Sequence, residues 1–343
     1  MRNLKYSEAL SEGLVQAMER DPNIFVTGIA VDYPSGIFGS TTEASRRFPK
    51  RVFDAPAMEN ALTGIAIGAA AMGKRPVVVH PRNDFMFLAF DMMINLAAKW
   101  KYMYGGNAGS VPIVVRGVIG KGWGQGASHS QSLQSVLAHF PGLNVVMPAF
   151  PRDAKGLMLA ALTSSSPVII LEHRTLYDTL GEVPEAAEPT PIGKAAVVRQ
   201  GRDLTIVATS FMAYESLHAA EQLAGEGIDA EVVDVRSIRP LDEETILASV
   251  KKTGRLIVAD TSWELYGFCS EVAALVAEKG FEYLKAPVRR IALANCPAPV
   301  SQTLEKAFYP TATTIAKVAL ALLGKHSSAF GDIDREDNFK GPY

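Results

Sequence analysis

Two short stretches, residues 112–116 (PIVVR) and 167–171 (PVIIL), set the fold class of this 343-residue chain. Each is an almost uninterrupted apolar run, and similar runs occur at 24–27 (IFVT), 76–80 (PVVVH) and 144–147 (NVVM). Strands that are buried on both faces of a parallel sheet have this composition. Longer segments with helical periodicity lie between the runs, at 7–20, 59–72, 87–104 and 153–164. The alternation predicts a doubly wound α/β domain with a mostly parallel sheet.

The same alternation resumes after a segment rich in proline and glycine. Residues 179–193 hold Gly181, Pro184, Pro189 and Pro191 among acidic residues, which is typical of a linker. Strands are then expected at 203–208, 230–235, 255–260 and 288–292, with helices at 214–226, 243–252, 268–279 and 311–323. We therefore predict two doubly wound domains, over residues 1–180 and 194–325, joined by a linker at 181–193 and followed by a tail at 326–343.

Composition and charge exclude several classes of protein. Hydrophobic residues make up 48% of the chain, which excludes a disordered protein. The formal net charge is −2, which argues against a nucleic-acid or anionic-membrane partner bound by bulk positive charge. No apolar run is long enough to span a membrane, and residues 1–6 lack the pattern of a signal peptide. Cys269 and Cys296 form no zinc motif or disulfide framework, so a reducing cytoplasm is the expected location.

The first candidate site residue is Glu59, which precedes a helix rich in alanine and glycine at 64–73 (GIAIGAAAMG). A carboxylate in the first turn of a helix is favoured by the helix dipole. The small residues indicate close packing against another helix or a ligand. A helix-start acid that faces solvent is the alternative interpretation.

A glycine-rich loop at 120–132 (GKGWGQGASHSQS) follows the strand at 112–116. Ligands of open α/β sheets bind beyond the carboxyl ends of strands, so His129 in this loop is a candidate site residue. The loop lacks the pattern of a phosphate-binding P-loop. Phe85 lies beyond the strand at 76–80, where it is either a core residue or a stacking wall for a flat ring.

Four stretches, in this order, resemble a known family. They are Glu59 with 64–70, residues 94–99 (INLAAK), residues 129–132 (HSQS) continuing through 139–148, and residues 236–242 (RSIRPLD) with 249–255 (SVKKTGR). Together they are similar to the beta subunit of the thiamine-diphosphate-dependent decarboxylating component of 2-oxo acid dehydrogenases, a transketolase-like superfamily that includes pyruvate, branched-chain 2-oxo acid and acetoin dehydrogenases. The similarity extends over about residues 4–323.

The resemblance implies a shared active site. The first domain would bind the aminopyrimidine of thiamine diphosphate, and the second would resemble the transketolase C-terminal domain and build an alpha2beta2 assembly. A separate alpha subunit would hold the diphosphate and Mg²⁺ through a Gly-Asp-Gly…Asn signature, which this sequence lacks. A lipoyl acyltransferase is a further candidate partner. The chain is therefore expected to supply half of an active site.

The resemblance also assigns roles to single residues. Glu59 corresponds to the glutamate that bonds the pyrimidine ring nitrogen, where a shared proton favours the imino tautomer that deprotonates thiazolium C2. Phe85 corresponds to the aromatic residue that stacks on the pyrimidine, and Met58 is grouped with the same cofactor contacts. His129 corresponds to a general acid/base near the substrate and the lipoyl group.

Some positions depart from the family pattern or match it loosely. Residues 28–30 read Gly-Ile-Ala where relatives usually carry Gly-Glu-Asp. The resemblance links these two acids to communication between paired active sites, so their absence argues against such communication in this chain. The basic segment 80–85 (HPRNDF) makes His80 and Arg82 candidates to meet an anionic substrate, such as a sugar phosphate or a dicarboxylate; a loop salt bridge is the alternative. Backbone carbonyls around Ile113 and Ala161 correspond to a structural K⁺ site.

Three functions are consistent with these observations. The first is a beta subunit that decarboxylates a 2-oxo acid and transfers the acyl group to a lipoyl carrier. The second is the C-terminal half of a split transketolase-like ketol transferase, which uses no lipoyl protein. The third is a non-catalytic assembly subunit, against which the presence of both Glu59 and His129 argues.

Overall fold

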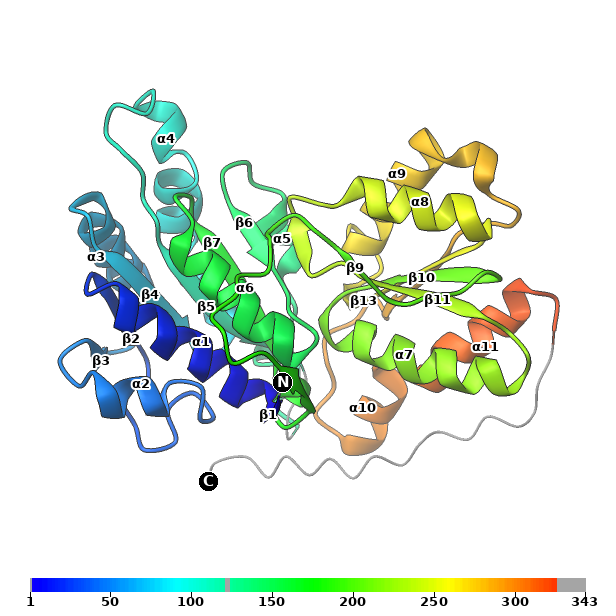
Figure 1. The fold of residues 1–343 in the computed structure, drawn as a ribbon, viewed down its shortest axis with the longest axis horizontal. Coiled ribbons are helices and arrows are strands. Elements are labelled where there is room, and N and C mark those ends of the chain that lie inside the picture. The colour runs from blue at the N-terminus through cyan, green and yellow to red at the C-terminus, as the bar shows by residue number, and fades with distance from the viewer. Residues whose placement is uncertain (1, 121–123, 326–343) are drawn as a thin grey trace. The chain divides into compact units, whose positions relative to one another are not determined.

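The computed structural model describes residues 2–120 and 124–325 of the chain, which form two compact units (Figure 1). The first unit comprises the residues up to Gly120, Ser132–Ile192 and Ile238–Pro240. The second comprises the described residues from 124 to Gln131, Gly193–Ser237 and those from Leu241 to 325. Residues 121–123 of the glycine-rich loop and the expected tail at 326–343 lie outside the described residues.

A mostly parallel sheet forms the centre of the first unit. Within the described residues its strand order is β12-β6-β7-β5-β4-β2-β3, and the pairs from β6 through β3 are all parallel. Strands β5 and β7 are buried at every position, as the apolar runs predict. The bounds are β2 Ile24–Gly28, β3 Val52–Asp54, β4 Arg75–His80, β5 Val114–Ile119, β6 Asn144–Val146, β7 Val168–His173 and β12 Ser237–Arg239.

Helices cover this sheet. Helices α1 and α6 pack side by side, and α3 packs on β4 (Figure 1). The α-helices of the unit are α1 Tyr6–Arg20, α2 Thr42–Arg47, α3 Glu59–Ala71, α4 Trp100–Met103, α5 Gln134–Ala138 and α6 Pro151–Thr163, and η4 Arg174–Leu176 is a 3-10 turn. A two-stranded antiparallel pair, β1 (Arg2–Lys5) with β8 (Leu180–Val183), completes the unit. The expected linker therefore begins with a paired strand.

The single helix expected at 87–104 is wrong. The chain instead forms a 3-10 helix, η1 (Asn83–Ala89), a π-helix, η2 (Asp91–Ala97), and the short α4. In the π-helix the N–H of Ala98 donates to the carbonyl oxygen of Met93, five residues earlier. Because 3-10, π and α turns all return to one face every three to five residues, apolar spacing does not distinguish them.

The second unit contains a sheet with strand order β14-β13-β10-β11-β9 in the described residues. All pairs are parallel except β11–β9, and Figure 1 shows α8 and α9 on one face with α7 and α11 on the other. The strands are β9 Ala196–Arg199, β10 Leu204–Ala208, β11 Ala230–Asp234, β13 Leu256–Trp263 and β14 Arg289–Leu293. The helices are η3 Gly126–Ser128, α7 Ser210–Gly225, α8 Glu243–Thr253, α9 Phe268–Lys279, η5 Phe281–Tyr283, α10 Gln302–Phe308 and α11 Ala312–Leu322.

The prediction of two doubly wound α/β domains is confirmed by these sheets. Of the helices in residues 2–120 and 124–325, none combines the length and the apolar character that crossing a bilayer requires.

Candidate functional site

The carboxyl ends of four parallel strands of the first unit lie along one edge of the sheet. In β2, Gly28 is in register with Asp54 of β3 and Val79 of β4. His80, the last residue of β4, is in register with Gly117 of β5. Loops that follow these strands place Glu59, His80, Arg82 and Phe85 at this carboxyl edge, where ligands of open α/β sheets bind.

Glu59 is the first residue of α3 and is only 8% exposed. The alternative of a helix-start acid in solvent is therefore wrong for this residue. Helix α3 contacts η1, which carries Phe85. Phe85 is 38% exposed and Met58, the residue before Glu59, is 40% exposed. A buried carboxylate beside accessible large apolar side chains suits a flat heterocycle that both stacks and forms a hydrogen bond.

His129 lies at the end of η3 in the second unit, whereas Glu59 and Phe85 belong to the first unit. Its side chain is half-buried, and its ring Nδ1 lies 3.0 Å from the hydroxyl oxygen of Ser128. The neighbouring Gly126 has a φ of 66° and approaches Val300 so closely that a Cβ atom would lie 2.6 Å from a methyl carbon of that valine. This approach fixes the loop just before His129.

His80 is 1% exposed, and burial lowers its pKa to about 4. Its Nε2 atom has no hydrogen-bond partner within the described parts of the chain. The ring is therefore neutral at pH 7, and His80 does not supply a positive charge to an anion. The basic character of this segment rests on Arg82.

The titration of His80 predicts a pH dependence of stability. The folded state has the lower pKa, so stability is retained above the ordinary value of 6.5 and falls as the pH drops from there towards about 4. Across that window the wild-type chain is expected to lose about 3 kcal/mol more unfolding free energy than His80→Leu. Urea unfolding at several pH values measures this. His218→Leu, on the partly exposed face of α7, is the control. The same change of unfolding free energy with pH in the wild type and in His80→Leu would contradict the prediction.

Sequence analysis missed a buried ion pair beneath the carboxyl edge. The guanidinium of Arg116, in β5, donates two hydrogen bonds of 2.6 and 2.8 Å to the carboxylate of Glu172, in β7. Both side chains are about 1% exposed or less. Burial alone would lower the pKa of Arg116, but the Glu172 carboxylate raises it overall. The signal in the sequence was an arginine in one apolar strand, Arg116, and a glutamate in another, Glu172.

Two further arginines surround an aromatic ring near this pair. Arg82 follows β4, Arg174 follows β7, and their guanidinium carbons lie 5.7 and 4.8 Å from the ring centre of Phe38. Phe38 belongs to the loop that follows β2. We refer to Arg82, Arg116 and Arg174 as the arginine cluster. Of its members, only Arg82 was predicted as a site residue.

The carbonyl oxygens of the K⁺ site that the resemblance implied also accept hydrogen bonds from the protein. The carbonyl oxygens of Ile113 and Ala161 accept the N–H groups of Val168 and Ser164. In the same segment the Arg75 guanidinium donates to the carbonyl oxygens of Leu162 and Ser164, at 3.2 and 2.9 Å. A carbonyl oxygen has two lone pairs and can accept an N–H and still coordinate a cation, so the K⁺ site stays a prediction.

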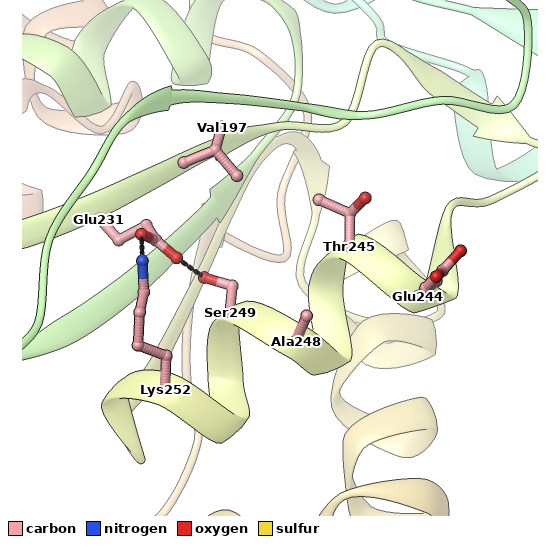
Figure 2. A pocket seen from close by; sticks show the side chains of 7 residues that line it. All are labelled: Val197, Glu231, Glu244, Thr245, Ala248, Ser249 and Lys252. Carbon is pink, nitrogen blue, oxygen red and sulfur yellow. Dashed lines mark hydrogen bonds and ion pairs between the residues drawn. The ribbon is translucent and has the colours of Figure 1, made fainter.

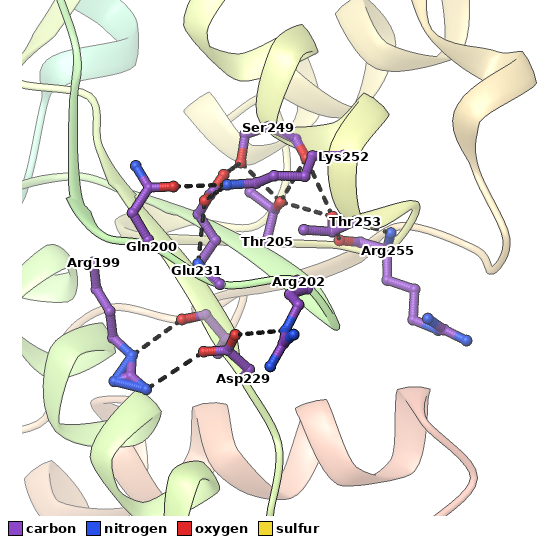
Figure 3. A network of polar contacts seen from close by, with 12 residues as sticks. Arg199, Gln200, Arg202, Thr205, Asp229, Glu231, Ser249, Lys252, Thr253 and Arg255 are labelled. Atoms are coloured by element: carbon purple, nitrogen blue, oxygen red, sulfur yellow. Dashed lines mark hydrogen bonds and ion pairs between the residues drawn. The ribbon is translucent and has the colours of Figure 1, made fainter.

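The second unit has a separate concavity of about 460 Å³ that contains none of the predicted site residues (Figure 2). Its lining is Val197, Glu231, Glu244, Thr245, Ala248, Ser249 and Lys252. Figure 3 shows that Glu231 accepts from both Lys252 and Ser249. The Thr205 hydroxyl oxygen lies 2.8 Å from those of Ser249 and Thr253. These polar groups bond to one another, so we assign them to the cohesion of α8 with its sheet.

Comparison with known proteins identifies the family. The model of the transketolase pyrimidine-binding domain matches residues 2–179, and that of the transketolase C-terminal domain matches residues 193–315. The chain is 40% identical over 337 residues to acetoin:2,6-dichlorophenolindophenol oxidoreductase subunit beta of Cupriavidus necator, covering 95% of this chain and 99% of that one. The chain belongs to the transketolase-like beta subunits of 2-oxo acid dehydrogenases.

Other relatives agree with this assignment. This beta-subunit chain is 40% identical to pyruvate dehydrogenase E1 component subunit beta of Rickettsia felis, with 90% and 94% of the two chains covered. A solved structure described as a split gene transketolase, inactive beta4 tetramer, aligns with a TM-score of 0.77 at 24% identity, over 94% of this chain and 98% of that one. The latter likeness shows the fold alone.

Proposed function

We propose that this protein is the beta subunit of a thiamine-diphosphate-dependent enzyme that decarboxylates a 2-oxo acid and transfers the acyl group to a lipoyl carrier. The observation that carries the proposal is Glu59, a buried carboxylate at the carboxyl edge of a pyrimidine-binding domain. Similarity to named beta subunits over nearly the whole chain supports the same class.

Glu59 would hold a proton at the pyrimidine ring nitrogen of the cofactor. Burial of the carboxylate excludes water from that contact, so the proton stays shared between the two groups. Phe85 would provide an aromatic face for the pyrimidine, and Met58 would line the same side. Thiamine diphosphate supplies the electron sink for the loss of CO₂, and the chain supplies orientation and proton control.

His129 is our candidate for moving a proton on the substrate or the lipoyl group. Its polar surroundings and the nearby Ser128 hydroxyl keep the imidazole accessible to hydrogen bonds. We place the diphosphate and Mg²⁺ on an alpha subunit, because the sequence lacks the Gly-Asp-Gly…Asn signature. We also propose an alpha2beta2 assembly, a lipoyl acyltransferase partner and a cytoplasmic location; the free thiols of Cys269 and Cys296 suit a reducing compartment.

Because the chain is proposed to supply only half of the active site, we expect the isolated chain to have negligible activity. Adding its alpha subunit should produce thiamine-dependent release of CO₂ from a 2-oxo acid, because only then are both halves of the cofactor held. The measurement is CO₂ release by the chain alone, the alpha subunit alone and the reconstituted pair. Full turnover by the isolated chain would contradict the prediction. Ketose-dependent turnover by the pair would favour the split transketolase, and no cofactor binding would favour an assembly subunit.

A further inference from the structure

The glycine-rich loop that carries His129 starts and finishes on the first unit. Its described residues from 124 to 131 group with the second unit, whereas the residues on either side of the loop group with the first. At the start of the loop, a Cβ atom on Gly120 would lie 2.2 Å from Nε2 of His173, the last residue of β7. At its end, Leu133 directly precedes α5 and is 2% exposed. Both ends of the loop are therefore fixed by packing within the first unit.

Asn83 holds the end of the loop through a hydrogen bond. The backbone N–H of Leu133 donates to Oδ1 of Asn83 at 3.0 Å, across 50 positions of the chain. The Asn83 side chain is 0% exposed, and its Nδ2 donates to Oδ2 of Asp84 at 3.3 Å. Because one neighbour is a donor and the other an acceptor, this orientation of the carboxamide is the one that serves both. Losing the acceptor would leave a buried N–H group without its bond, which is costly.

The element that carries Asn83 is closely packed on the sheet. Asn83 is the first residue of η1, and Phe85 lies two residues further on. A Cβ atom on Gly117, in β5, would lie 2.6 Å from Sδ of Met86 and 3.2 Å from Cβ of Asn83. The glycine therefore allows η1 to approach β5, and η1 also contacts α3 and β4. Asn83 thus presents its carboxamide from a well-supported position.

The segment around Leu133 has weaker support of its own. Helix α5, which follows Leu133, is only five residues long, and so short a helix has little stability in isolation. Ser132 is 4% exposed, and its hydroxyl has no hydrogen-bond partner in residues 2–120 and 124–325. Of the two partners in this hydrogen bond, η1 is the fixed one and the loop end is the one that is held.

We propose that Asn83 is a positioning residue for His129, because its carboxamide fixes the chain four residues beyond that histidine to the element that carries Phe85. This inference rests on the proposed function, in which the His129 imidazole moves a proton. Proton transfer requires hydrogen-bond distance, and a displacement of about 1 Å can lower a rate by ~100-fold. Asn83 itself holds no reacting atom and acts through the loop.

The first test measures the loop without any activity. Leucine has the branched shape of asparagine but no hydrogen-bonding atom, so Asn83→Leu removes only the acceptor. Amide hydrogen exchange of the full chain, followed by mass spectrometry, should be about 10-fold faster in the peptide over residues 129–135, as expected for one hydrogen bond. Peptides from β5 should keep their protection. Unchanged exchange of residues 129–135 would overturn the inference.

Two variants accompany this measurement. Asn83→Asp keeps an oxygen that accepts the Leu133 N–H, so it should retain most of the protection; it also serves if Asn83→Leu fails to fold. Protection lost in Asn83→Asp as fully as in Asn83→Leu would count against the hydrogen bond. Asn23→Leu is the matched control, because the Asn23 carboxamide oxygen accepts a 3.1 Å bond from Lys74 at the opposite edge of the same sheet. It should leave residues 129–135 unchanged.

The second test separates two steps in the complete alpha–beta complex. Asn83→Leu should slow thiamine-dependent CO₂ release from a 2-oxo acid by about 10-fold, part of the ~100-fold or more that general acid–base catalysis contributes. It should leave exchange of the cofactor C2 proton unchanged, because that step depends on Glu59. A variant that had only lost structure would slow both steps, and that outcome would overturn the inference.

A double-mutant cycle asks whether Asn83 acts through His129. In a His129→Ala background, Asn83→Leu should cause no further loss of CO₂ release, because the imidazole that it positions is gone. Losses that multiply would show that the two residues act independently and would overturn the inference, with the proposed function intact. Release from no 2-oxo acid by the wild-type complex would remove the proposed function and with it the role of His129. The exchange experiment would still decide whether Asn83 holds the loop.

Discussion

Replacing Glu59 by glutamine in the reconstituted complex should slow proton loss from C2 of the bound cofactor by at least ~100-fold, the low end of general acid–base contributions. Glutamine is nearly the same size as glutamate, but its amide cannot hold the shared proton at the pyrimidine nitrogen. Exchange of the C2 proton with deuterium, followed by NMR, isolates this step from substrate binding and lipoyl transfer. The effect corresponds to about 2.7 kcal/mol or more of lost transition-state stabilisation.

The matched control for this experiment is Glu43→Gln. Glu43 also lies in the first turn of a helix, α2, but it is exposed and pairs with Arg46. We expect it to leave the exchange rate unchanged. Wild-type exchange in Glu59→Gln would remove Glu59 from the mechanism, even though the carboxylate is buried.

Breaking the buried ion pair between Arg116 and Glu172 should strongly destabilise the fold. Arg116→Met leaves the Glu172 carboxylate at the centre of the sheet without its cation, and we expect a loss of about 3–5 kcal/mol in unfolding free energy. Urea or thermal unfolding of the full chain measures this. Because the loss comes from an uncompensated buried charge, adding Glu172→Leu to Arg116→Met should restore part of the stability.

An exposed ion pair offers the comparison. Arg46→Met removes the partner of Glu43 on the surface of α2, where water screens both charges, and no measurable change is expected. Equal losses of unfolding free energy in Arg46→Met and Arg116→Met would show that burial does not determine how much the Arg116–Glu172 pair contributes to stability. A double variant less stable than Arg116→Met would show that Glu172 has other indispensable contacts, such as the Tyr177 hydroxyl.

The apolar runs of the sequence located the long buried strands but not the short ones. The apolar runs at 76–80 and 167–171 became β4 and β7 almost as expected. By contrast β3, with three residues, and β8, with a largely exposed pattern, gave no recognisable run. Such strands exist because a neighbouring strand offers its free backbone groups. For β8 that neighbour is β1, 175 residues or more away along the chain, and such a partner leaves no local signature.

Glu59 was singled out by its place at the start of a helix of small residues, and its role was assigned through the family resemblance. Its burial was then decided by the packing of α3 against η1 and β4. His80 illustrates the opposite outcome. Its sequence neighbours indicated a cation, but the sheet buries the ring and lowers its pKa to about 4. The charge of a titratable side chain depends on its contact with water, and tertiary packing determines that contact.

The sequence by itself determined the two α/β domains, the family and the acidic residue on which the chemistry is proposed to depend, because strand runs, helix starts and motifs are short-range features. Only the tertiary structure decided that Arg82 and Arg174 share the ring of Phe38, and that Arg116 is neutralised by Glu172. In the sheet, β7 lies beside β5 and β5 beside β4, so loops that are far apart in the chain end at one edge. The physical reason is that strand order is fixed by packing of whole elements, which no local stretch encodes.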